Sequence, residues 1–217
     1  MLRGIVFDMD GVVIDSHPAH KRAWRRFLQT IGQNVTDEDL NFVLDGRKRD
    51  EILRHFLGEL SPAQISEYGA LKDRILLQLN NGLRPLPGVR QFLNSASRAG
   101  IRIGLATSGG SQRTWGTLEE LGLNQYFETV VTGDQVDSGK PDPAIYRLAA
   151  ERLNERPNCL LAVEDAVCGV ESARAAGMRC LGVASPDRAE ALRAAGAYAI
   201  ISDFRCLSLT KLRESFD

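Results

Sequence analysis

Residues Ile5 to Ser16 read IVFDMDGVVIDS, and this stretch decides how the rest of the chain is interpreted. Gly4 to Phe7 form an apolar run typical of a buried strand, and Asp8 and Asp10 follow it before a break at Gly11. In open parallel α/β sheets, ligands bind beyond the carboxyl ends of the strands, where these acids would stand. A turn rich in Asp that only closes a strand would contain the same residues, so the pair alone leaves both interpretations open.

The composition and charge restrict the classes of partner. A chain of 217 residues suffices for one large domain, or for one domain carrying an insertion. Lys and Arg number 27 and Asp and Glu 28, and this net charge of −1 argues against nucleic acid or an anionic membrane as the main partner. No heptad pattern is present, so a monomer is the default expectation.

The cysteines and the apolar runs bear on the compartment. The 4 cysteines show no CxxC spacing and lie in or beside apolar runs, which is typical of reduced core cysteines. The start of the sequence has no secretory leader pattern, and no apolar run reaches the roughly 18 residues that a membrane span needs. We therefore expect a cytoplasmic protein that does not enter the membrane.

Residues 17–81 differ in character from the rest, because their apolar residues recur at helical spacing with Arg and Lys between them. Thr36 and Ser61 are candidate N-caps, and the turn Arg84–Gly88 (RPLPG) closes the segment. The predicted helices are Pro18–Ile31, Thr36–Leu44, Arg49–Leu57 and Pro62–Leu79.

After Gly88 the chain alternates between helices and near-continuous apolar strands, which is typical of a parallel sheet covered on both faces. The predicted strands are Ile101–Thr107, Thr129–Thr132, Cys159–Glu164, Met178–Ala184 and Tyr198–Ile201. The predicted helices are Val89–Ala99, Gln112–Leu121, Pro143–Leu153, Val167–Ala176 and Ala189–Ala195. The predicted fold class is therefore α/β, with a doubly wound, Rossmann-like parallel-sheet core (residues 1–16 and 82–217) and a four-helix cap (residues 17–81) inserted after the first strand.

Polar residues fall at the carboxyl ends of the predicted strands. They are Asp8, Asp10, Thr107, Ser108, Lys140, Glu164 and Asp165. Each has an ordinary explanation as a turn, a solvated loop charge or a helix cap, but all of them share one edge of the sheet. Converging carboxylates repel one another unless a cation lies between them, and hard oxygen ligands of this kind suit Mg²⁺.

The same edge has the components of phosphoryl transfer. Thr107 can donate its hydroxyl to a phosphate, as can the backbone N–H groups of Ser108 and Gly109 at a helix start, and Lys140 supplies a positive charge. A carboxylate such as Asp8 can attack phosphorus to give an acyl phosphate. Asp10, two residues further on, stands where a proton acceptor is needed for the second step.

The order DMDGVVIDS, ATSGG, GKPDP and VEDAVCGV resembles the four motifs of the haloacid dehalogenase (HAD) superfamily, in the branch whose helical cap follows the first strand. The resemblance implies that Asp8 is the nucleophile and Asp10 the general acid/base and a carbonyl ligand of Mg²⁺. It also implies that Thr107 and Lys140 contact the phosphate, while Asp165 and Glu164 hold the metal. The second Asp of the DxD pair favours phosphatases and phosphomutases over dehalogenases.

The cap resembles that of β-phosphoglucomutase in the stretch from His20 to Trp24, in GRKR at 46–49 and at Lys72. This resemblance implies that Arg49 binds a distal phosphate, that His20 positions Asp10 and that Lys72 contacts the substrate. Asp73 stands where the mutase has Asn. Solvated charges and, for Trp24, packing within an amphipathic helix are the ordinary explanations for these residues.

Three functions follow from these residues. The first is a Mg²⁺-dependent phosphatase that hydrolyses a small phosphorylated metabolite, a sugar phosphate, because phosphatases with this cap outnumber the mutases. The alternative is a β-phosphoglucomutase that interconverts β-glucose 1-phosphate and glucose 6-phosphate. The third is a regulatory binding protein without turnover, against which the intact catalytic set counts.

Overall fold

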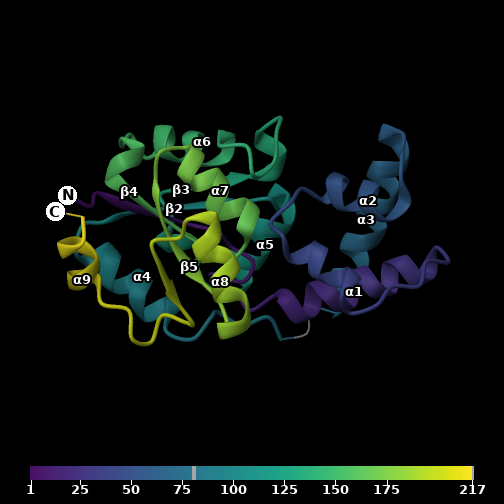
Figure 1. Ribbon diagram of the computed structural model, residues 1–217, viewed down its shortest axis with the longest axis horizontal. Coiled ribbons are helices and arrows are strands. Elements are labelled where there is room, and N and C mark those ends of the chain that lie inside the picture. Colours follow the sequence, from purple (N-terminus) through teal and green to yellow (C-terminus); the bar gives the residue numbers. More distant parts are fainter. Residues whose placement is uncertain (80–81, 217) are drawn as a thin grey trace.

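The computed structural model describes residues 1–79 and 82–216, which form a parallel sheet with helices on both faces and a helical cap at one end (Figure 1). In chain order the elements are β1 (Gly4–Phe7), α1 (His17–Thr30), η1 (Asp39–Leu44), α2 (Arg49–Leu57), α3 (Pro62–Leu79), α4 (Val89–Arg98), β2 (Arg102–Thr107), α5 (Ser111–Glu120), η2 (Asn124–Tyr126), β3 (Thr129–Thr132), η3 (Gly133–Gln135), α6 (Ala144–Arg152), η4 (Pro157–Cys159), β4 (Leu160–Glu164), α7 (Val167–Ala175), β5 (Arg179–Val183), α8 (Pro186–Ala195), β6 (Ala199–Ile201) and α9 (Leu209–Glu214), where η marks a 3-10 helix.

Within the described residues, the sheet has 6 parallel strands in the order β3-β2-β1-β4-β5-β6. β1 pairs with β2 on one side and β4 on the other, so that Phe7 lies opposite both Leu105 and Val163. The chain winds away from β1 in both directions, which places the topological switch point between β1 and β4. The predicted strands are confirmed, and each predicted end lies within one residue of the observed end.

Separate apolar cores cover the two faces of the sheet. Ile5 and Phe7 are fully buried on the face covered by α4, α5 and α9, whereas Val6 is buried on the face covered by α6, α7 and α8. Successive side chains of a strand point to opposite faces, so β1 contributes to both cores. The predicted doubly wound core is therefore confirmed. Helix α9 was not predicted, because its short sequence buries only Leu212 and gives no helical repeat.

The cap differs from the prediction at its second helix. In place of an α-helix from Thr36, the structure has the 3-10 helix η1 from Asp39. The N-cap of η1 is Glu38 and not Thr36, but Thr36 and Asp39 bond reciprocally ahead of it: Thr36 Oγ1 accepts from the N–H of Asp39 at 3.2 Å, and Asp39 Oδ2 accepts from the N–H of Thr36 at 2.8 Å. Ser61 caps α3 in the same reciprocal way with Gln64, at 3.3 and 2.9 Å. The described cap thus has three α-helices and one 3-10 helix.

The cap has an apolar core of its own, formed by buried residues between Ala19 and Leu76. Trp24 lies at its centre with 1% of its surface exposed, and its ring meets that of Phe27 edge to face at 5.7 Å between centroids. The interpretation of Trp24 as a packing residue is confirmed, although its ring also borders the cavity described below.

Two adjacent segments connect the cap to the sheet. The N–H of Asp15 donates to the carbonyl of Arg84, and the N–H of Leu86 donates to the carbonyl of Val13, both at 2.9 Å. The predicted boundary after residue 16 coincides with the start of α1, whereas the boundary at residue 81 lies outside the described residues. Gly11 lies in the first connection at a φ of +78°, where a Cβ would come within 2.5 Å of Asp165 Oδ2. Only glycine fits this position without strain.

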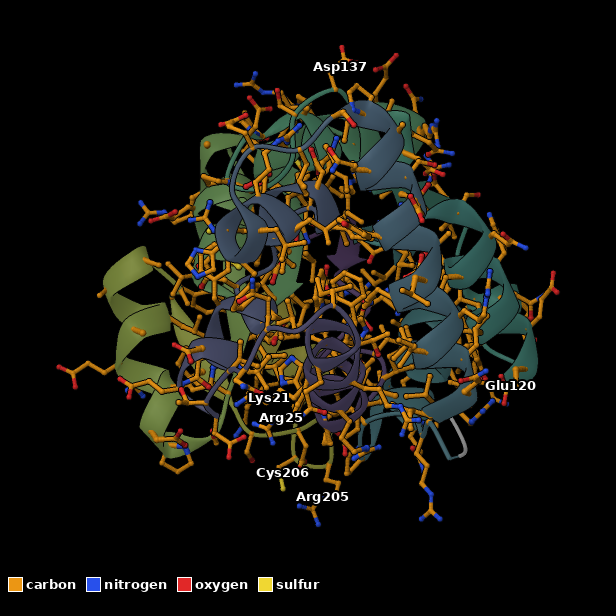
Figure 2. All side chains as sticks on the ribbon, turned by 90° about the vertical axis from the view of Figure 1, so that its right-hand side faces the viewer. Lys21, Arg25, Glu120, Asp137, Arg205 and Cys206 are labelled. Carbon is orange, nitrogen blue, oxygen red and sulfur yellow. The ribbon has the colours of Figure 1, made fainter. Side chains whose placement is uncertain are left out.

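Seen from the cap side, charged side chains project outward at the edge of the molecule, among them Asp137 and Glu120, while Lys21 and Arg25 lie on the lower part of the face toward the viewer (Figure 2). No helix in the described part of the chain is long and apolar enough to cross a membrane. All 4 cysteines are free. Cys168 and Cys180 are buried, as expected of core cysteines, whereas Cys159 is partly exposed and Cys206 is exposed, so the prediction is wrong for these two.

Candidate active site

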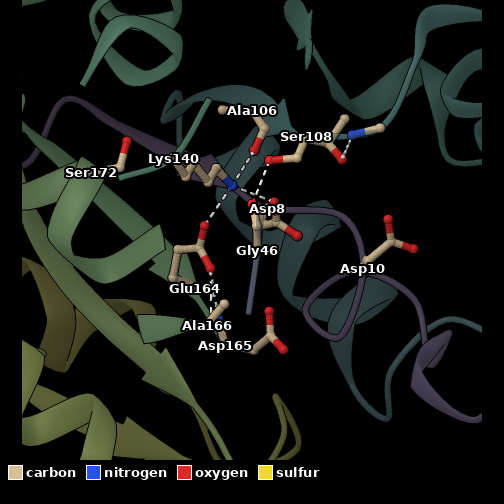
Figure 3. Close-up of polar contacts among 12 residues, drawn as sticks. Asp8, Asp10, Gly46, Ala106, Ser108, Lys140, Glu164, Asp165, Ala166 and Ser172 are labelled. Carbon is tan, nitrogen blue, oxygen red and sulfur yellow. Dashed lines mark hydrogen bonds and ion pairs between the residues drawn. The ribbon is translucent and has the colours of Figure 1, made fainter. Parts of the chain in front are cut away.

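The strand ends bring the predicted core residues together (Figure 3). Asp8 follows β1, while Thr107 and Glu164 end the strands on either side of it, β2 and β4. A cavity of about 400 Å³ opens over these strand ends and is closed from the other side by residues of the cap. This volume is within the range of small-molecule sites.

The ammonium group of Lys140 connects the carboxylates of Asp8 and Glu164. It donates to Asp8 Oδ1 and to Glu164 Oε1, each at 2.6 Å, and to the carbonyl of Ala106 at 3.1 Å (Figure 3). Only 1% of the residue is exposed. Burial opposes the charge of Lys140, but the charges of Asp8 and Glu164 outweigh this effect and raise its pKa. Lys140 is therefore a permanent buried cation.

Glu164 has hydrogen-bond donors on both of its carboxylate oxygens. Oε1 accepts from Lys140 and from the Tyr146 hydroxyl at 2.8 Å, while Oε2 accepts from the N–H groups of Asp165 and Ala166 at 3.0 and 3.2 Å. The residue is 1% exposed. Glu164 was expected among the metal ligands. Its contacts favour a different role, that of holding Lys140 in place.

Asp8 and Asp165 are the other buried carboxylates of the site, and Arg188 Nη1 lies 3.6 Å from Asp165 Oδ2. Burial raises the pKa of Asp8 well above its usual value, and the charges of Glu164, Asp165 and Asp10 add to this effect, in spite of Lys140. Asp165 Oδ2 is buried and accepts no hydrogen bond of normal geometry from the described residues, although His17 Nε2 lies 2.7 Å away. The pair is chemically suited to a hard cation.

A complete metal cage does not exist in the described part of the chain, where no group of three or more His, Cys, Asp or Glu side chains could hold a metal by itself. Mg²⁺ commonly binds through one or two carboxylates and completes its shell with water and substrate phosphate. The acids at this sheet edge fit that manner of binding.

Asp10 is held by Arg113, a residue that the sequence motifs did not indicate. Arg113 donates through Nη1 to Oδ1 at 3.1 Å and through Nη2 to Oδ2, while Ser16 Oγ donates to Oδ1 at 2.6 Å. Although burial opposes ionisation, the charge of Arg113 keeps the pKa of Asp10 well below its usual value. His20 Nε2 lies 3.2 Å from Oδ1. Burial and the charge of Lys72 lower the pKa of His20 to about 4, so Arg113 is the cation that keeps Asp10 ionised near neutral pH.

The predicted phosphate-binding groups lie at the start of α5. Thr107 is 1% exposed, and its Oγ1 accepts from the N–H of Gly109 at 3.1 Å. The hydroxyl of Ser108 donates instead to the carbonyl of Gly46 in the cap, at 2.6 Å. The side chain of Ser108 thus connects the sheet to the cap, which leaves its backbone as the group available to a phosphate.

The predicted cap residues border the same cavity, but they differ in burial and in their bonding partners. Lys72 is 4% exposed, with its ammonium 5.4 Å above the Trp24 ring, so the solvated-charge interpretation is wrong for it. Arg49 has 44% of its side chain exposed and forms an ion pair with Asp73. Lys48 donates to the carbonyls of Val136 and Asp137 in the core at 2.6 and 2.9 Å. Lys48 thereby connects the cap to the core.

Comparison with known proteins extends the resemblance in the motifs. The family pattern of haloacid dehalogenase-like hydrolases matches residues 2–177. A phosphorylated carbohydrates phosphatase from Thermotoga maritima is 36% identical over 217 residues, covering 97% of this chain and 99% of that protein. The β-phosphoglucomutase of Bacillus subtilis is 32% identical over 191 residues, covering 84% of this chain and 83% of that protein.

The fold is matched as well. A crystal structure of β-phosphoglucomutase from Clostridium difficile superposes with a TM-score of 0.87 at 24% identity, covering 100% of this chain and 97% of that one. The similarity therefore includes the cap as well as the sheet. This chain is an enzyme of the haloacid dehalogenase-like hydrolase family.

Proposed function

We propose that this enzyme is a Mg²⁺-dependent phosphatase that hydrolyses a small phosphorylated metabolite, a sugar phosphate, through a phosphoenzyme on Asp8. The observation that carries the proposal is the 2.6 Å contact of Asp8 Oδ1 with Lys140, beside Asp10, at the floor of a cavity that the cap closes. A carboxylate in this place can attack phosphorus while the fixed ammonium stabilises the negative charge of the transferring group.

The reaction then has two steps. In the first, an oxygen of Asp8 forms a bond to phosphorus as the bond to the ester oxygen breaks, and the leaving alcohol takes the proton that Asp10 carries in its minor, protonated form, which leaves Asp10 ionised. In the second, water attacks phosphorus and gives a proton to Asp10, which releases inorganic phosphate and regenerates Asp8. The ionised form of Asp10 that Arg113 maintains is the form that the second step needs.

Asp8, Asp165 and the backbone carbonyl of Asp10 are the groups that we assign to Mg²⁺. The raised pKa of Asp8 and the buried Oδ2 of Asp165, which accepts no hydrogen bond of normal geometry from the described residues, support this assignment, because a cation beside the two carboxylates would offset the burial of their charge. When bound, Mg²⁺ would supply positive charge that stabilises the transferring phosphoryl group. Glu164 has the separate role of holding Lys140. Thr107 and the backbone of Ser108 and Gly109 are assigned to the phosphate.

We further assign residues 17–81 to a cap domain that closes over bound substrate and limits the access of water. His20, Lys72 and Arg49 are its proposed substrate-facing residues, since all three border the cavity. The monomeric state and the cytoplasmic location expected from the sequence stay predictions.

A β-phosphoglucomutase activity is the second candidate, favoured by the 32% identity to the Bacillus subtilis enzyme. Phosphatase activity is preferred because the Thermotoga maritima phosphatase is 36% identical and covers 97% of the chain. The two reactions differ in the group that accepts the phosphoryl group, which is water in one and a sugar hydroxyl in the other.

A test assays the purified enzyme with Mg²⁺ against a panel of phosphate esters, with release of inorganic phosphate as the readout. A parallel assay supplies β-glucose 1-phosphate with a bisphosphate primer and follows glucose 6-phosphate. We expect phosphate release that depends on Mg²⁺ and is abolished in Asp8→Asn. Rapid formation of glucose 6-phosphate with little free phosphate would establish the mutase instead, and full activity of Asp8→Asn would remove Asp8 as the nucleophile.

A further inference from the structure

The cations on the cap side of the cavity already have partners. Arg47 contacts Asp45 and Glu51 at 3.4 and 3.3 Å, Lys48 donates to two core carbonyls, and Arg49 is paired with Asp73. A second anionic group on a substrate would therefore meet cations whose charge is already compensated. This matters because recognition of a phosphate normally uses guanidinium or ammonium groups with N–H donors to spare.

The ion pair of Arg49 and Asp73 is positioned by the packing of α2 against α3. Arg49 begins α2 and lies across α3, where Gly69 is one helical turn before Asp73. A Cβ at Gly69 would lie 2.6 Å from Nε of Arg49, so a larger residue would displace the guanidinium. Glycine inside a helix is less favourable than alanine. At Gly69 the absence of a side chain leaves room for the Arg49 guanidinium, which forms the ion pair with Asp73.

Lys72 is the remaining cap cation at this wall, and it is not equivalent to an arginine with free N–H groups. It is 4% exposed, its ammonium lies over the Trp24 ring, and Asp73 Oδ1 is 3.5 Å away. Burial lowers its pKa to about 8, which reflects the cost of keeping the charge in this place. Asp73 thus lies between two cations and lowers the net positive charge that both present to the cavity.

We propose that Asp73 is a specificity-determining residue that reserves the cap side of the cavity for an uncharged, hydroxyl-bearing part of the substrate, so that the enzyme selects monophosphates of sugars or polyols over bisphosphates. This inference rests on the proposed phosphatase function and names its substrate class. Sugar hydroxyls both donate and accept, so they can bind to the Asp73 carboxylate and to the remaining N–H groups of Arg49 together. A second phosphate can only accept from Arg49 and is repelled by Asp73.

The test measures this discrimination with two probes that share one sugar, glucose 6-phosphate and glucose 1,6-bisphosphate. Dissociation constants are measured by calorimetry with Mg²⁺ in Asp8→Asn protein, which prevents turnover, and kcat/KM is measured by phosphate release in otherwise unchanged enzyme. We expect the monophosphate to be preferred in both measurements. Asp73→Asn frees Arg49 and should move both ratios toward the bisphosphate by about tenfold, the effect of one partly exposed charge-assisted contact.

A control ion pair exists on the same cap. Asp37 pairs with Arg25 at 2.6 Å, and neither residue lines the cavity. Asp37→Asn therefore removes a cap carboxylate and its ion pair without changing the cavity wall, and should leave the ratios unchanged. Gly69→Ala should displace Arg49 and weaken the response of the ratios to Asp73→Asn.

Several outcomes would overturn the inference. They are equal binding of the two probes in the presence of Asp73, no binding of either, a ratio that Asp73→Asn leaves unchanged, or an equal shift in Asp37→Asn. Loss of the proposed function looks different. In that case no phosphate would be released from any ester, while the calorimetric ratio would still respond to Asp73→Asn.

Discussion

The guanidinium of Arg113 and the carboxylate of Asp10 form a two-point contact across the floor of the cavity. Arg113 comes from the first turn of α5 and Asp10 from the loop after β1, so the contact joins segments that follow adjacent strands. The side chain of Arg113 is 12% exposed. Two parallel hydrogen bonds fix the plane of the carboxylate as well as its position, which a single ammonium contact would not do.

We predict that Arg113→Met lowers kcat/KM for a sugar phosphate by about 100-fold, because Asp10 loses the group that orients it. The pH profile should change as well. Arg113 lowers the pKa of Asp10, and the second step needs Asp10 ionised, so activity falls as the pH drops through that pKa. Without Arg113 the pKa rises, and the acid limb of the kcat profile should move to higher pH.

Arg102→Met provides the comparison, since it removes an arginine paired with Glu128 at 3.0 Å on the sheet, outside the residues that line the cavity. Arg113→Lys, which keeps the charge but loses the planar fork, should recover the position of the acid limb more fully than kcat. Unchanged activity and an unchanged acid limb in Arg113→Met would show that Asp10 is positioned by Ser16 and His20 alone.

The core of this site was predictable because its residues occupy strand ends. Parallel strands bring their carboxyl ends to one edge, so Asp8, Thr107 and Glu164 had to meet once the strands were recognised from their apolar runs. Lys140 is not at a strand end, and its position was predicted only from the loop that follows β3. The separate roles of Glu164 and Asp165 could not be predicted in this way. Glu164 and Asp165 are adjacent in sequence, and only their hydrogen bonds show that one is saturated and the other is not.

The residues that the motifs did not indicate are those whose roles depend on helix orientation. Arg113 lies six positions after Thr107, and His17 starts the cap, yet they reach Asp10 and Asp165. The pairing of Arg49 with Asp73 depends on how α2 crosses α3. Such contacts are set by the rotation of each helix and by side-chain rotamers, which the spacing of apolar residues does not determine. The Gly69–Asp73 spacing was the available signal, and it is too common to be specific.

His20 should make the stability of the fold depend on pH. Its pKa is lowered from 6.5 to about 4 by burial and by Lys72, so below pH 6.5 the unfolded chain binds a proton that the folded protein does not. The free energy of unfolding should therefore fall as the pH drops from about 6.5 to about 4, by up to about 3 kcal/mol from this residue. Urea unfolding at several pH values measures this slope.

The neutral variants His20→Gln and His20→Asn should each flatten that slope, because neither side chain takes up a proton in the unfolded chain. Using both separates the loss of the ionisable group from a change in packing, which differs between the two side chains. A slope equal to that of the unchanged enzyme in both variants would contradict the assignment of His20 as a buried neutral imidazole.

Lys72 should show the cost of placing a buried ammonium at a substrate-facing position. Only 5% of its side chain is exposed, and the pKa is lowered to about 8, so the folded protein pays for the charge at neutral pH. We predict that Lys72→Met raises the free energy of unfolding at pH 7 by roughly 1–3 kcal/mol. It should also lower kcat/KM for a sugar phosphate at least about tenfold, because a donor to the substrate is lost.

The direction in which the stability gain of Lys72→Met changes with pH distinguishes removal of a buried charge from improved apolar packing. Below pH 8 the lysine is charged in both states and the penalty is complete, whereas from pH 8 to about 10.5 the folded protein loses the proton first. The stability advantage of Lys72→Met should therefore shrink over that interval. Lys21→Met removes a lysine whose hydrogen bond to Asn41 is exposed, and should change stability by less than about 0.5 kcal/mol. If Lys72→Met instead destabilised the enzyme at every pH, the contacts of the ammonium with Trp24 and Asp73 would outweigh its burial, and Lys72 would be a structural residue of the cap.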